Sequence, residues 1–112
     1  MRIAIPMAEG KLAVHFGHCQ TFAIIDINAG AKKIIGRQDI PAPPHEPGLL
    51  PRWLAEHSVN MVIAGGMGRR AIDLLAQQNI EVILGAQPDV PEKVIMDHLA
   101  GTLQTGENPC DH

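Results

Sequence analysis

The chain has 112 residues, a formal net charge of −3 and a hydrophobic content of 46%. This length predicts a single domain that is large enough to bury a core. The negative charge offers no basic field to a phosphate backbone, and an aromatic content of 3% leaves few rings for base stacking, so we expect no nucleic-acid binding. The apolar runs are too short to span a membrane, and Pro6 and Glu9 interrupt any leader, which favours a cytoplasmic protein.

Short apolar runs separated by turn residues predict a mixture of strands and helices. We expect strands at residues 3–5, 21–27, 32–38, 61–64 and 82–84, and helices at residues 49–57, 69–78 and 91–100. The first strand is expected to stop at Pro6. The order β-β-β-α-β-α-β-α predicts an α/β fold, a five-stranded mixed sheet with about three helices packed on it. We assign the domain to residues 1–103 and a flexible tail to residues 104–112.

The connections between the expected elements fix the strand directions. Hairpins make neighbouring strands antiparallel, whereas helical crossovers make them parallel. The loops after the first, third, fourth and fifth strands should therefore open at one edge of the sheet, where ligands of open α/β sheets bind. Those loops are residues 7–20, 39–48, 65–68 and 85–89.

The segment His15-Phe16-Gly17-His18-Cys19 places a cysteine beside two histidines in the first of these loops. Thiolate and imidazole groups hold soft and borderline metals and iron–sulfur clusters. Gly17 permits a tight turn that would direct His15, His18 and Cys19 into one pocket. In the alternative interpretation His15 is a hydrogen-bonded loop residue, His18 is exposed to solvent and Cys19 is an inert buried thiol.

His45 and Cys110 are further candidate metal ligands. His45 lies in a proline-rich loop, where it is a ligand, a lid residue or simply part of a shaped connection. Cys110 stands beside Asp111 and His112 at the end of the sequence, and the alternative for this segment is a frayed terminus.

A glycine-rich turn, Gly65-Gly66-Met67-Gly68, separates an expected strand from the helix that begins at Arg69. Small residues and the N–H groups of a helix start suit an anion. We therefore take the four residues of the turn together with Arg69 as a candidate cofactor-binding set. The turn matches neither the Walker nor the dinucleotide motif. The alternatives are a plain strand-to-helix turn and a Met67 side chain that belongs to the core.

No arrangement of residues indicates catalysis. The carboxylates are scattered, and the only serine, Ser58, lies in no nucleophile motif. We therefore expect a protein that is not an enzyme.

The chain resembles the dinitrogenase iron–molybdenum cofactor biosynthesis family, whose members include small nitrogenase cofactor carriers and chaperones. The resemblance covers nearly the whole chain and rests on the opening Arg-Ile-Ala-Ile-Pro, on His15-Phe16-Gly17, on residues 62–68 and on Gly101-Thr102-Leu103. It implies a ribonuclease-H-like fold without nuclease activity. It also implies binding of an iron–sulfur or molybdenum–iron–sulfur species, with His15 as the motif histidine.

The leading hypothesis is a non-catalytic carrier of such a cluster or its precursor. His15 and Cys19 would be the primary ligands, and His18, His45 and Cys110 the secondary ones. We expect cluster donor and acceptor proteins as partners, no membrane, and a monomer or weak homodimer. The alternatives are a mononuclear metal site such as zinc, a nucleotide- or anion-binding domain built on the glycine turn, and an adaptor without a cofactor.

Overall fold

The structure of the protein is a computed structural model that describes residues 1–44, 46 and 48–106, apart from the side chain of His18. The strands are β1 (Arg2–Ala8), β2 (Lys11–Leu12), β3 (Thr21–Asn28), β4 (Lys33–Pro41), β5 (Met61–Ile63) and β6 (Glu81–Ile83). The helices are α1 (Leu49–Glu56), α2 (Arg69–Gln77) and α3 (Pro91–Ala100), with a short 3₁₀ helix, η1 (Phe16–His18). Within the described residues, no helix has the length and apolar character needed to cross a membrane.

The sheet is mixed, with the order β4-β3-β1-β5-β6. β3 is antiparallel to β1 and to β4, whereas β5 is parallel to β1 and β6 is parallel to β5. The predicted strand directions are therefore confirmed, and the loops after β1, β4, β5 and β6 share one edge. The described sheet has six strands rather than the five expected, because β2 pairs with the end of β1. Two residues are too few to show a periodicity, although the positive φ angles of Glu9 and Gly10 suit a tight hairpin.

β1 continues through Pro6 to Ala8, so the prediction that the strand stops at Pro6 is wrong. Met1 and Ile27 exchange both backbone hydrogen bonds, at 3.3 and 2.9 Å. Because bonded and non-bonded pairs alternate in an antiparallel ladder, the nitrogen of Pro6 faces away from β3. On that other side the pairing with β5 has already ended at Ala4, and Ala13 donates its N–H to the carbonyl oxygen of Pro6 at 2.7 Å, so the strand continues although Pro6 has no N–H group to donate.

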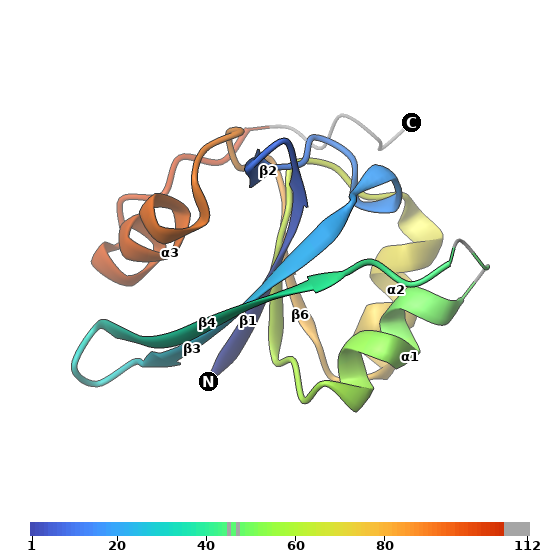
Figure 1. Ribbon diagram of the computed structural model, residues 1–112, viewed down its shortest axis with the longest axis horizontal. Coiled ribbons are helices and arrows are strands. Elements are labelled where there is room, and N and C mark those ends of the chain that lie inside the picture. Colours follow the sequence, from blue (N-terminus) through green and yellow to red (C-terminus); the bar gives the residue numbers. More distant parts are fainter. Residues whose placement is uncertain (45, 47, 107–112) are drawn as a thin grey trace.

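Side chains alternate between the two faces of the sheet and form two apolar layers. Ile3 and Ile5 of β1 pack with Ile95 of α3 on one face. On the other face Ala4 packs with Leu54 of α1 and Leu75 of α2. Figure 1 shows the same arrangement, with α3 on one side of the sheet and α1 and α2 on the other.

The loop after β1 is pressed against the end of β5 at Gly65. A Cβ atom on Gly65 would lie 2.8 Å from the carbonyl oxygen of Val14 and 3.0 Å from its Cα. Real Cβ atoms do not approach backbone atoms so closely, so only glycine lets the two segments meet. Gly68, three positions later, has open space around the corresponding site and an ordinary φ of −68°.

We expect Gly65→Ala to lower the free energy of unfolding by about 1–3 kcal/mol, because the added methyl group must push the Val14 backbone away from β5. Urea unfolding followed by circular dichroism measures the change. The matched control is Gly68→Ala, where no atom of the described residues opposes the methyl group; because Gly68 is the N-cap of α2, the change in stability should stay below about 1 kcal/mol. Equal effects of the two substitutions would contradict the close contact.

Candidate functional site

The two sequence motifs meet directly at the carboxyl edge of the sheet. His15 forms an isolated parallel bridge with Gly66, and the backbone N–H of Phe16 donates to the carbonyl oxygen of Gly66 at 2.9 Å. In Figure 1 the η1 turn and the start of α2 lie at the same end of the molecule. The structure therefore brings His15 beside the glycine turn, as the strand directions predict.

Two buried side chains hold these loops in place. Phe16 is 4% exposed and meets the ring of Phe22 edge-to-face, with centroids 5.8 Å apart. Met67 is 1% exposed and belongs to the same apolar layer. Phe16 therefore anchors η1, and Met67 anchors the glycine turn from inside the core.

Around these anchors, His15, Gly68, Arg69 and Arg70 are exposed, and we call these four residues the exposed edge. The first helical hydrogen bond of α2 runs from the backbone N–H of Ile72 to the carbonyl oxygen of Gly68, at 3.2 Å. The N–H groups at residues 69–71 therefore form the open start of the helix, which favours a negative charge.

The two arginines of the exposed edge differ in their surroundings. Arg69 lies 3.6 Å from Asp73 in an ion pair whose side chains are 77% and 61% exposed, so solvent screens it strongly. Arg70 makes no ion pair with any residue that the structure describes. The edge thus presents two guanidinium groups and a helix start to an anion.

Cys19 lies just beyond η1 and is only partly buried. Its side chain packs against the apolar layer that contains Phe16 and Phe22. Burial raises the pKa of the Cys19 thiol to about 11, because the thiolate would lose its hydration. The thiol is therefore neutral near pH 7, and metal binding would have to displace its proton.

The five predicted metal ligands are placed unequally. His15 lies on the exposed edge and Cys19 follows four residues later, whereas His45, Cys110 and the side chain of His18 lie outside the described part. Residues 1–44, 46 and 48–106 contain no group of three or more His, Cys, Asp or Glu side chains able to hold a metal ion. The described donors therefore form at most an open site.

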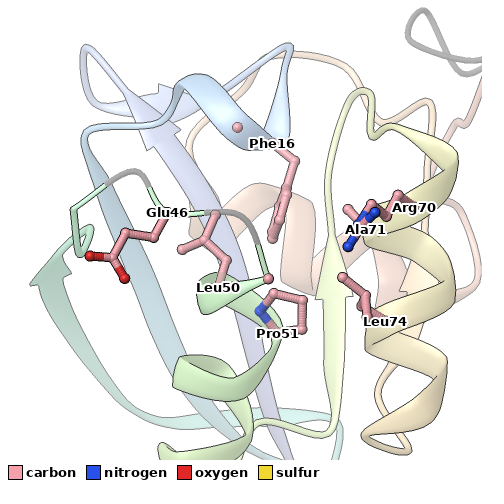
Figure 2. Close-up of a pocket in the computed structure, with 9 residues that line it drawn as sticks. Phe16, Glu46, Leu50, Pro51, Arg70, Ala71 and Leu74 are labelled. Atoms are coloured by element: carbon pink, nitrogen blue, oxygen red, sulfur yellow. The ribbon is translucent and has the colours of Figure 1, made fainter.

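Sequence reasoning missed a cavity of about 480 Å³ beside η1, between the starts of α1 and α2 (Figure 2). Its lining consists of Phe16, Gly17, Glu46, Gly48, Leu50, Pro51, Arg70, Ala71 and Leu74. The expected helices carried Leu50 and Leu74 on their apolar faces. No sequence pattern, however, shows that the two helix starts stand apart.

The segment after α3 was also not expected to pair with the sheet edge. Thr105 forms an antiparallel bridge with Ala86, and the N–H of Gly106 donates to the carbonyl oxygen of Gly85 at 2.8 Å. A Cβ on Gly85 would lie 2.0 Å from the oxygen of Gly106, so this contact depends on glycine. Residues 104–106 thus lie against the loop after β6.

We expect Cys19 to react slowly with iodoacetamide at pH 8, because a pKa of about 11 leaves little thiolate. Mass spectrometry of the peptide that contains Cys19 measures the rates in the folded chain and in the chain in urea, with added glutathione as the reference thiol. Folding should slow alkylation of Cys19 by about tenfold or more. As the pH rises through about 11, this protection should disappear. Equal rates in the folded and unfolded chains would contradict the neutral thiol.

Comparisons with known proteins agree with this geometry. The model of the family described as dinitrogenase iron-molybdenum cofactor matches residues 1–101. A protein described as uncharacterized protein MJ0580, from Methanocaldococcus jannaschii, is 30% identical over 96% of this chain and 92% of its own length. The crystal structure of PH0822 has a TM-score of 0.86 and 29% identity, and the match covers 94% of each chain.

The apo form of the orange protein from Desulfovibrio gigas has a TM-score of 0.73 and 19% identity, covering 96% of this chain and 94% of that one. This likeness shows a shared fold. The family model spans both motifs that meet at the exposed edge. The chain therefore belongs to the dinitrogenase iron-molybdenum cofactor family.

Proposed function

We propose that the protein is a carrier that reversibly binds an anionic iron–sulfur or molybdenum–iron–sulfur species at the exposed edge. The observation that supports this most strongly is the bridge between His15 and Gly66, which joins the motif histidine to the glycine turn. His15 would be the primary ligand. The open N–H groups at the start of α2, together with Arg69 and Arg70, would balance the negative charge of the cargo.

The donor set fits a cargo that is held loosely. A structural zinc site surrounds its metal with about four protein ligands. The described residues offer no group of three donors, which argues against such a closed site among them. A preformed cluster brings its own sulfides, so one or two protein ligands and a complementary charge can hold it. An open coordination shell also suits a carrier, which must release what it binds.

Cys19 would join this site only in the loaded protein. Its thiol is neutral and partly covered by apolar side chains, and a bound metal would have to displace the proton and draw the side chain outward. Ligation by His18, His45 and Cys110 also stays a prediction. The carrier would receive its cargo from a donor protein and pass it on, with no catalysis of its own.

Anaerobic reconstitution with iron, sulfide and molybdate tests the proposal. We expect a visible chromophore and acid-labile sulfide to remain with the protein after gel filtration. His15→Ala should lower the bound iron by roughly tenfold or more, because loss of a ligand costs at least as much as loss of a second-shell partner. Raising the salt concentration should weaken binding, since screening reduces the attraction between the cargo and the arginines.

The matched control is His98→Ala, a half-buried histidine on α3, which packs on the other face of the sheet. This substitution should leave the bound iron unchanged. Bound zinc without labile sulfide would favour a mononuclear site instead. Equal loss of iron in both variants, or none in His15→Ala, would refute binding at the exposed edge.

A further inference from the structure

The cavity beside η1 shares Arg70 with the proposed cluster site, but its apolar walls are not used there and have the features of a separate binding site. Its volume of about 480 Å³ lies in the range of small-molecule pockets. Phe16, Leu50, Pro51 and Leu74 give it largely apolar walls. In Figure 2 these side chains face a common space between α1 and α2. A ligand could therefore bury an apolar body there.

The cavity has a positive group at its rim. Arg70 lines it, is exposed, and has no ion-pair partner in the described ranges. Arg2, Arg37 and Arg69 are instead paired with carboxylates, and Arg52, which likewise makes no ion pair with a described residue, does not line the cavity. Figure 2 shows the nitrogen atoms of Arg70 on the side of α2 that borders the cavity. The guanidinium is thus available to a ligand.

Glu46 and Arg70 are the two charged residues among the described residues that line the cavity. In Figure 2 the carboxylate of Glu46 is turned away from the apolar side chains. A single guanidinium suits a ligand with one negative charge better than a phosphate with two. A planar carboxylate also matches the paired N–H donors of arginine.

We propose that this cavity binds a small organic carboxylate with an apolar body. The carboxylate pairs with Arg70, and the hydrocarbon part lies against Phe16, Leu50 and Leu74. Phe16 directly follows His15 in the chain, so the ligand contacts the same loop that carries the exposed edge. The site shares only Arg70 with the exposed edge, and its apolar walls, which lie outside that edge, distinguish it from the proposed cluster site.

Sodium octanoate is a suitable probe, and metal-free protein keeps the test independent of cluster binding. We expect a titration followed by ¹⁵N NMR to shift the amide signals of Phe16, Gly17, Leu50, Arg70 and Leu74. Arg70→Gln should weaken octanoate binding by about tenfold or more, because a hydrogen-bonded ion pair is lost. Arg69→Gln is the matched control: Arg69 is adjacent in sequence but pairs with Asp73 and does not line the cavity, so binding should be unchanged.

Neutral octanol provides a second measurement on the same protein. Octanol should bind to the unmodified chain more weakly than octanoate does, since it cannot pair with the guanidinium. For the same reason its affinity should be equal for the unmodified chain and for Arg70→Gln. Octanol binding as tight as octanoate binding would overturn the carboxylate assignment. Shifts scattered over the surface, or equal losses in the two arginine variants, would overturn the site itself. Failure of cluster reconstitution alone would leave these results unaffected.

Discussion

The close backbone contact between the loop after β1 and the glycine turn after β5 is the constraint on which the candidate site depends. The Val14 backbone fits against Gly65 only because Gly65 lacks a Cβ atom, and the next residues, His15 and Gly66, form a bridge. Phe16 and Met67 fix the two sides of this contact from within the core. The backbone of the motif histidine is thereby placed beside the glycine turn that leads into α2.

The sequence was sufficient to predict this meeting, because it depends on strand direction. Hairpin and crossover rules place the ends of β1 and β5 at one edge; the glycine turn comes just after β5, and His15 lies in the loop after β1, beyond β2. Features that depend on packing distance were not predictable. β2 is too short for a periodic pattern, the path of β1 through Pro6 depends on where β5 stops, and the cavity at Arg70 depends on the separation of two helices.

The chemistry of the exposed edge is that of an open anion site with few metal ligands. Its positive charge comes from two solvated arginines and a helix start, whereas the nearby Cys19 thiol is kept neutral by burial. Such a surface suits the proposed anionic cargo without enclosing it, and the chain belongs to a cofactor-related family. The cavity on the other side of Phe16 gives the same loop a second, mainly apolar contact surface.

The most direct test of the central claim is a map of the backbone amide signals that change when the protein is loaded with the cluster. If the cargo sits where His15 meets the glycine turn, the ¹⁵N NMR signals of residues 14–17 and 65–70 should shift or broaden first. Those of α3, on the opposite face of the sheet, should stay in place. Changes centred on α3, or spread evenly over the chain, would contradict the account.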